Sequence, residues 1–239
     1  MPVTQPLPRR LLSEFLGTAL LLAVVVGSGI AASDLSPDDV GLQLLENSTA
    51  TALGLAVLIL VLGPVSGAHF NPIVTLADWY LSRRDPEGFS ARHVAPYVAV
   101  QVAGAVAGTL LANAMFDVGT TFSEHERASG GHLVGEVVAT AGLVLVIFSL
   151  MRSNRAPLAA PAVGAYIGAA YWFTSSTSFA NPAVAVGRMF SDTFAGIAPS
   201  SVPAFVSAEI AGMVIGAVLV LALYPAIPVH HRHQGEGRA

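Results

Sequence analysis

The sequence of 239 residues is too hydrophobic and too poor in charge for a typical soluble domain. Hydrophobic residues make up 54% of the chain, charged residues 11%, and the mean hydropathy is +0.66, whereas about 25% of the residues of a soluble domain are charged. With no Cys and a net charge of -4, the chain offers no disulfide, no thiolate site and no basic stripe for nucleic acid. These features predict an integral membrane protein in the lipid bilayer.

Six apolar stretches are long enough to cross a bilayer, which takes about 20 residues. In chain order they cover residues 11–32, 44–62, 94–116, 133–151, 157–174 and 203–225, of which the fifth is the shortest. Two further apolar stretches begin at Asn71 and Asn181 but are too short to span, so we expect them to enter the bilayer and turn back. The sequence therefore predicts an all-α membrane protein of six transmembrane helices plus two re-entrant half-helices.

The positions of the arginines predict the orientation. All eleven basic residues are Arg, and with both termini in the cytoplasm only Arg127 and Arg188 lie elsewhere, which agrees with the positive-inside rule. We expect a multi-pass protein of the inner (plasma) membrane. The tail holds His230, His231 and His233, which could bind a metal, but residues 227–239 are interpreted as a short disordered tail. Neither a metal nor a cofactor is expected.

The chain repeats itself within one domain, residues 1–239, with halves at about 9–116 and 131–226. Glu14 and Thr18 open the first span, and Glu136 and Thr140 open the fourth. Each half then carries an Asn-Pro pair before its short apolar segment. Because three spans precede the second half, that half enters from the opposite side of the membrane, which makes an inverted repeat. In such folds the site lies at the midplane between the halves.

The two Asn-Pro pairs predict the starts of the half-helices. Asn is a good N-cap and Pro is tolerated at the first helical position. A helix that begins inside the bilayer has unpaired amide donors and about +0.5 charge at that end. Two such ends that meet at the midplane oppose cations and protons, while the side chains of Asn71 and Asn181 offer donors to a neutral oxygen. The irregular loops before each Asn expose carbonyls, which is tolerated where they line water.

A carboxylate inside the bilayer needs a partner. Glu14 and Glu136 occupy equivalent positions of the repeat, so the favoured hypothesis is that they accept hydrogen bonds from loop amides and hold the two loops. A proton relay is the alternative hypothesis. His69 is a further possible partner for Glu14, in a structural role. Glu209 has no evident partner in the repeat and receives no role.

At this point the residues resemble a known family. Ser66-Gly-Ala-His-Phe-Asn71-Pro-Ile-Val-Thr75 and Phe179-Ala-Asn181-Pro-Ala183 are similar to the two Asn-Pro-Ala loops of the aquaporins and aquaglyceroporins, and Glu14 and Glu136 stand at that family's two helix-start glutamates. The resemblance implies a right-handed six-helix bundle, a pore in each subunit of a homotetramer, and no chemistry. It implies that the pore midplane is formed by Asn71, Pro72, Ile73, Asn181, Pro182 and Ala183, and that the pore-lining loop backbone comes from Gly67, Ala68, His69, Phe179 and Ala180.

The sequence departs from the family pattern at two positions. Ile73 replaces the first Ala, which is a mild change. Val184 stands where the family usually places the Arg of its outer selectivity filter. The other filter positions, transferred by spacing from the motifs, fall at Thr51, Ala169 and Ser178. Such a filter is expected to be wide and uncharged. Arg188 lies one turn beyond Val184, where it either faces the outer vestibule or pairs with Asp192 at i+4, the favoured interpretation.

The sequence therefore predicts a passive channel for small uncharged solutes. Glycerol-like polyols, metalloid hydroxides and water are the expected solutes. Residues 184–196 also resemble the bacterial branch encoded among arsenic-resistance genes, which implies arsenite and methylated arsenicals. A water-selective channel of the same fold and an ion-coupled secondary transporter are the alternatives. A membrane hydrolase is disfavoured, since no catalytic motif is present.

Overall fold

The computed structural model describes residues 5–225, so the predicted C-terminal tail lies outside the described part. Its helices follow the predicted order: α1 Leu7–Leu35, α2 Val40–Ser66, α3 Pro72–Ser82, α4 Ala91–Met115, α5 Gly130–Arg152, α6 Ala159–Phe173, α7 Pro182–Arg188 and α8 Val202–Leu223. Short 3-10 turns precede α6 (Ala156–Leu158) and α8 (Pro199–Ser201). The predicted all-α fold of long apolar helices is confirmed.

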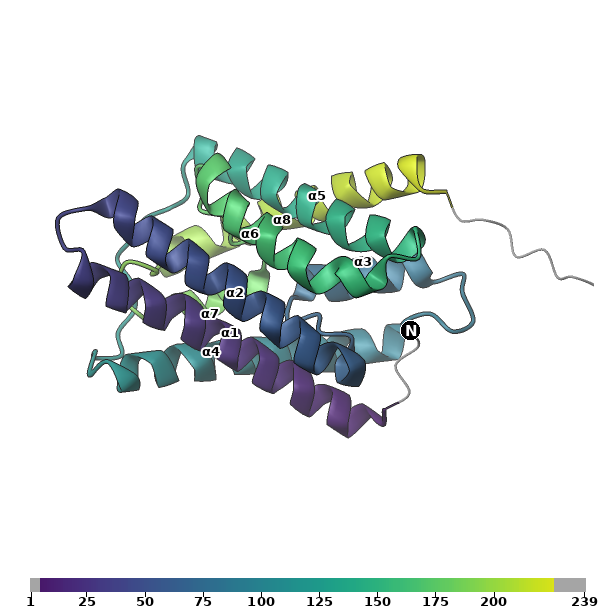
Figure 1. Ribbon diagram of the computed structural model, residues 1–239, viewed down its shortest axis with the longest axis horizontal. Coiled ribbons are helices and arrows are strands. Elements are labelled where there is room, and N and C mark those ends of the chain that lie inside the picture. Colours follow the sequence, from purple (N-terminus) through teal and green to yellow (C-terminus); the bar gives the residue numbers. More distant parts are fainter. Residues whose placement is uncertain (1–4, 226–239) are drawn as a thin grey trace, which may run out of the picture.

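Five of these helices (α1, α2, α4, α5 and α8) are long and apolar enough to cross a membrane. The remaining predicted span, the fifth in chain order, corresponds to α6, which has 15 residues and is extended by the 3-10 turn before it. The start of α1 and the end of α8 lie at the same end of the bundle (Figure 1). Six crossings require this arrangement, because an even number of crossings returns the chain to the side of the membrane on which it started.

The half-helices α3 and α7 begin at their Asn-Pro pairs. In α3 the Asn71 side chain accepts a hydrogen bond from the Ile73 N–H, and in α7 the Asn181 side chain accepts from the N–H groups of Ala183 and Val184. Pro follows each Asn at the first helical position, where a missing N–H costs nothing. Each Asn therefore acts as the N-cap of a helix that starts inside the bundle.

Two pairs of helices pack closely, and they do so in the same way in each half. Gly104 and Gly108 of α4 lie against the backbone carbonyls of Phe15 and Ala19 in α1. In the second half, Gly212 and Gly216 of α8 lie against the carbonyls of Val137 and Ala141 in α5, and a Cβ on either glycine would come 2.6 or 2.7 Å from that oxygen. The absence of a side chain lets the helices approach and fixes their register.

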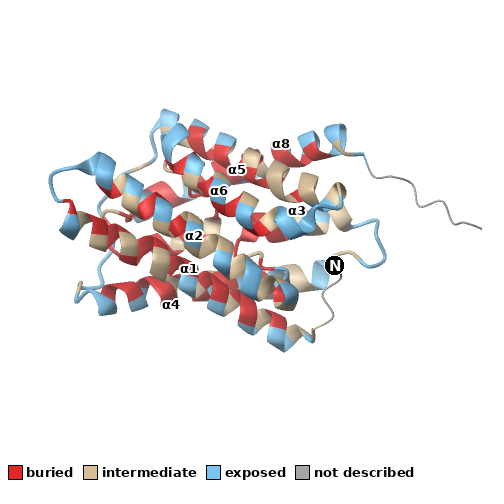
Figure 2. Cartoon of the chain, in the orientation of Figure 1, coloured by how far each residue is buried: buried red, intermediate tan, exposed pale blue. Residues whose placement is uncertain are grey.

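The outer faces of the bundle are apolar and the interior holds polar side chains. On α2, for example, Leu53, Val57 and Leu60 are all exposed. Glu14 and Gln101 are completely buried in the first half, and Glu136 and Glu209 in the second. Figure 2 shows the buried residues gathered toward the interior of the bundle. Apolar faces outside and partnered polar groups inside are expected when lipid surrounds the protein.

Candidate functional site

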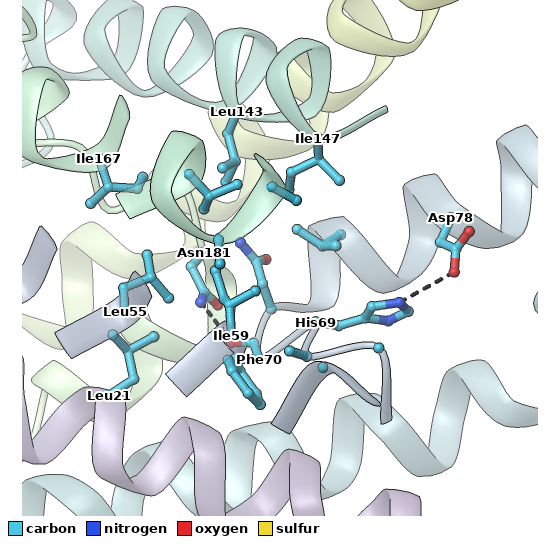
Figure 3. A pocket seen from close by; sticks show the side chains of 18 of the residues that line it. Leu21, Leu55, Ile59, His69, Phe70, Asp78, Leu143, Ile147, Ile167 and Asn181 are labelled. Atoms are coloured by element: carbon cyan, nitrogen blue, oxygen red, sulfur yellow. Dashed lines mark hydrogen bonds and ion pairs between the residues drawn. The ribbon is translucent and has the colours of Figure 1, made fainter. Parts of the chain in front are cut away.

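The two half-helices meet through a reciprocal pair of hydrogen bonds. The Asn71 side-chain amide donates to the carbonyl of Ala180 (2.7 Å), and the Asn181 amide donates to the carbonyl of Phe70 (2.8 Å; Figure 3). Each Asn thus caps its own helix with its oxygen and holds the opposite loop with its nitrogen. Since an amide nitrogen has two donors, each Asn keeps one for a passing oxygen.

The loops before each Asn have the same strained backbone. Gly67, Ala68 and Phe70 have positive φ angles of 93°, 50° and 49°, and the equivalent Thr177, Ser178 and Ala180 have 62°, 54° and 47°. Non-glycine residues adopt this region at a cost, so surrounding contacts must hold it in place. These φ angles turn successive carbonyls of each loop in different directions. The loop N–H groups therefore need acceptors from other parts of the protein.

Buried carboxylates supply those acceptors. The Glu14 oxygens accept from the N–H groups of His69 (3.0 Å) and Phe70 (2.7 Å), and the Glu136 oxygens accept from Phe179 (2.8 Å) and Ala180 (2.7 Å). This is the geometry expected if the carboxylates hold the loops. The His69 ring does not contact Glu14; its nitrogens lie 3.1 Å from the Thr75 hydroxyl and 3.2 Å from the Asp78 carboxylate.

Glu209, which received no role from the sequence, belongs to this support. Its carboxyl accepts from the Asn181 N–H (2.9 Å), and its second oxygen is buried without a hydrogen-bond partner among the described residues. In the first half the side-chain amide of Gln101 donates to Glu14 (2.8 Å). The same number of positions separates Gln101 from Glu209, Gly104 from Gly212, and Gly108 from Gly216. Glu209 is therefore the repeat equivalent of Gln101, a relation that the change of residue type conceals.

A cavity of about 740 Å³ runs past the paired asparagines. Asn71 and Asn181 line it beside the loop residues Gly67, Ala68, His69, Ser178 and Phe179. The rest of its wall is mainly apolar, and Figure 3 shows the side chains of Leu21, Leu55, Ile59, Leu143, Ile147 and Ile167 around Asn181. Polar groups on one side and apolar groups on the other suit a small solute that has hydroxyl groups and no charge.

At one end of the cavity, which we call the His69 end, the His69 ring points toward Asp78 (Figure 3). Phe89 also lines this end, with its ring centroid 5.1 Å from that of His69. The termini of the described chain are on this side of the bundle. The opposite end holds Arg188 and is called the Arg188 end.

Three of the four expected filter residues line the cavity, and Ala169 does not. Thr51, Ser178 and Val184 are buried in its wall, whereas Ala169 is exposed on α6. Tyr171 takes the place of Ala169: its hydroxyl lies 3.2 Å from that of Thr51, within hydrogen-bond reach. The reason is rotation, because two positions along a helix turn a side chain by about 200°. The cavity wall beside Thr51 therefore contains an aromatic ring, which the sequence did not predict.

Arg188 also lines the cavity, one turn beyond Val184. Its Nε donates to the Ala195 carbonyl, and its guanidinium lies 3.6 Å from the centre of the Phe179 ring. Asp192, the pairing partner favoured from the sequence, bonds instead to Ser123 and to the backbone N–H of Glu124. Arg188 therefore remains available to the cavity.

The segment between α4 and α5 packs against the segment that follows α7. Arg127 in this segment donates to the carbonyls of Gly196 (2.7 Å) and Phe194 (3.0 Å). Glu126 accepts hydrogen bonds from the hydroxyls of Ser200 (2.6 Å) and Ser201 (2.8 Å), and these bonds lower the pKa of that carboxyl. The sequence showed the charges of this segment but gave no sign of these contacts.

Comparisons with known proteins agree with the fold. The family model described as "Major intrinsic protein" matches residues 3–178. Aquaglyceroporin AqpS of Rhizobium meliloti (strain 1021) is 50% identical over 226 residues, which cover 93% of this chain and 94% of that protein. The glycerol uptake facilitator protein of Pseudomonas aeruginosa is 32% identical over 222 residues, 79% of this chain and 75% of that protein.

The X-ray structure of the aquaglyceroporin from Plasmodium falciparum superimposes with a TM-score of 0.67 at 20% identity, covering 90% of this chain and 96% of that one. Together the fold and the site define an integral, multi-pass membrane channel, not an enzyme. The chain belongs to the major intrinsic protein family.

Proposed function

We propose that the protein is a passive channel for small uncharged solutes, namely glycerol-like polyols, metalloid hydroxides such as arsenite, methylated arsenicals and water. The observation that carries the proposal is the cavity of about 740 Å³ that passes both Asn side chains along an otherwise apolar wall. A polyol can place its hydroxyls on the asparagines and loop carbonyls and its carbons on the leucine and isoleucine side chains. The relatives named for glycerol or as aquaglyceroporins support polyols as the principal class.

In this proposal Asn71, Pro72, Ile73, Asn181, Pro182 and Ala183 form the midplane. The half-helix starts keep the midplane positive against cations and protons. Thr51, Tyr171, Ser178 and Val184 form the filter at the Arg188 end. The absence of Arg at 184 favours polyols over a strict preference for water, although the Tyr171 ring limits the size of the solute.

The assembly in the membrane is part of the proposal. Nine of the eleven arginines lie on one side when both termini are cytoplasmic, so the His69 end faces the cytoplasm of a cell with an inner membrane. The exposed apolar faces of the helices suit lipid and the neighbouring copies of a homotetramer with one pore in each subunit.

Stopped-flow light scattering on proteoliposomes tests the transport proposal. Purified full-length protein should accelerate both water and glycerol equilibration, and glycerol flux should run downhill whatever proton or sodium gradient is imposed. Uptake of glycerol against its own gradient would establish the ion-coupled transporter instead. Rapid water flux with glycerol at the rate of empty liposomes would establish the water-selective alternative.

A further inference from the structure

The guanidinium of Arg188 is a buried cation without an anionic partner. The side chain is 3% exposed and lines the cavity. Within residues 5–225 no carboxylate lies within ion-pair distance of it, and its two terminal nitrogens have no hydrogen-bond partner. Burying an unpaired charge costs free energy unless hydrogen bonds or a polarisable group compensate. The Ala195 carbonyl, which accepts from the Arg188 Nε, and the Phe179 ring supply part of that compensation.

Because Arg188 lines the cavity, its remaining donors are available to a ligand there. Arg188 is the last residue of α7, and its Nε bond to Ala195 together with the Phe179 ring fixes the plane of the guanidinium. A fixed guanidinium presents its terminal N–H groups as a fork that matches two neighbouring oxygens. The Arg188 end of the cavity is thus prepared for a ligand with two oxygen acceptors.

A second unpaired polar group lines the same cavity. The Ser178 hydroxyl is buried (4% exposed) and has no hydrogen-bond partner among the described residues. Ser178 directly precedes Phe179, the residue whose ring lies against the guanidinium of Arg188. A hydroxyl group both donates and accepts, so it can complete the contacts of a solute whose oxygens lie on Arg188.

We propose that Arg188 and Ser178 form a solute-binding subsite for a neutral molecule with two adjacent hydroxyl groups, and that Arg188 is a second cation barrier in addition to the half-helix starts. The inference rests on the proposed function and adds a specificity-determining residue to it. The charge lies one helical turn beyond Val184, on nearly the same face of α7. A cation that enters from the Arg188 end meets this charge before it reaches the positive ends of the half-helices. A polyol instead exchanges its hydrogen bonds to water for hydrogen bonds to the fixed donors of Arg188.

The test replaces Arg188 with Met, which keeps most of the side-chain length and removes charge and donors. The variant should lose about tenfold in glycerol flux, the effect expected for losing one hydrogen bond to a charged donor, and water flux should fall less. Methylammonium, used as a small cationic probe, should begin to enter. Arg188→Lys should still exclude methylammonium but conduct glycerol poorly, because an ammonium group has no planar fork.

Two controls keep the result interpretable. Arg155→Met makes the same substitution at an exposed site outside the cavity and should match the wild type. The double variant Val184→Arg, Arg188→Met puts the charge back one turn inward and should again exclude methylammonium. Wild-type glycerol flux and cation exclusion in Arg188→Met would overturn the subsite while leaving the channel proposal intact. Wild-type protein that conducts no glycerol would instead refute the proposed function. If Arg188→Met does not fold, the Lys variant decides: wild-type glycerol flux in it refutes the subsite.

Discussion

Replacing Glu209 with Gln should leave the fold and the transport rate close to those of the wild type. The second oxygen of Glu209 is buried without a hydrogen-bond partner among the described residues, and burying an unpaired charged carboxylate is costly, so we expect Glu209 to be protonated. Glu136 already accepts two backbone N–H groups, which makes it the better site for the negative charge. Glu209 then acts as a neutral donor and acceptor, which is what Gln101 is in the first half.

The size of the effect follows from what each substitution leaves unpaired. Gln at 209 keeps an oxygen for the Asn181 N–H and replaces the unpaired oxygen with a neutral NH₂ group, so no buried group loses its partner. Leu at 209 leaves the Asn181 N–H without an acceptor at the start of α7. An unsatisfied buried donor costs about 1–3 kcal/mol, and more when the lost partner involves a charge.

The assay compares thermal stability in detergent and glycerol flux for Glu209→Gln, Glu209→Leu and the mirror variant Gln101→Glu. We expect Glu209→Gln to match the wild type at every pH from about 5 to 8, since the buried proton no longer matters. Glu209→Leu should be clearly less stable, and Gln101→Glu should be tolerated because it places in the first half the residue that the second half has at the equivalent position. If Glu209→Gln is as damaged as Glu209→Leu, then Glu209 carries the charge and the reasoning is refuted.

Four further substitutions test the pathway. Asn71→Asp or Asn181→Asp should lower glycerol flux and admit protons, because a carboxylate cannot donate to the opposite loop carbonyl and adds negative charge at the midplane; unchanged flux with no proton leak in a pH-dye assay would remove the role proposed for the asparagines. Val184→Arg should cut glycerol flux by tenfold or more and water flux less, measured by stopped flow; equal losses for both solutes contradict a filter at Val184. Tyr171→Ala should widen the same region and raise permeation by solutes larger than glycerol; normal expression with unchanged size selectivity would place the narrowest point elsewhere.

The helices and their repeat could be predicted because each depends on a local signal. Apolar runs of spanning length, Asn-Pro pairs at helix starts and Glu14 with its equivalent Glu136 are all visible in the sequence. A hydrophobic span needs no partner to be recognised, since the bilayer fixes its length. The ends of the helices were less visible: α1, for example, extends to Leu35, three residues past the predicted end.

The positions that the sequence misplaced depend on rotation or on contacts between distant segments. Ala169 was assigned by spacing, and a shift of two residues on α6 brings Tyr171 to the cavity instead. Asp192 is four residues from Arg188, but the segment between α4 and α5 supplies Ser123 and a backbone N–H to that carboxylate and leaves the arginine free for the cavity. No pattern within one helix could show this competition.

The repeat also explains why the midplane is held so rigidly. Each positive-φ loop would relax if its amides lost their acceptors, yet its carbonyls must keep pointing where a solute can reach them. The structure meets both needs by crossing the halves: Glu14 holds the loop of its own half, and Asn181 of the other half bonds the Phe70 carbonyl of that loop. Since the same pattern runs in the opposite direction through Glu136 and Asn71, neither loop can move without breaking a contact in the other. The two asparagines are therefore positioned by both halves at once, and this coupling explains why a substitution in either half should change a single common barrier.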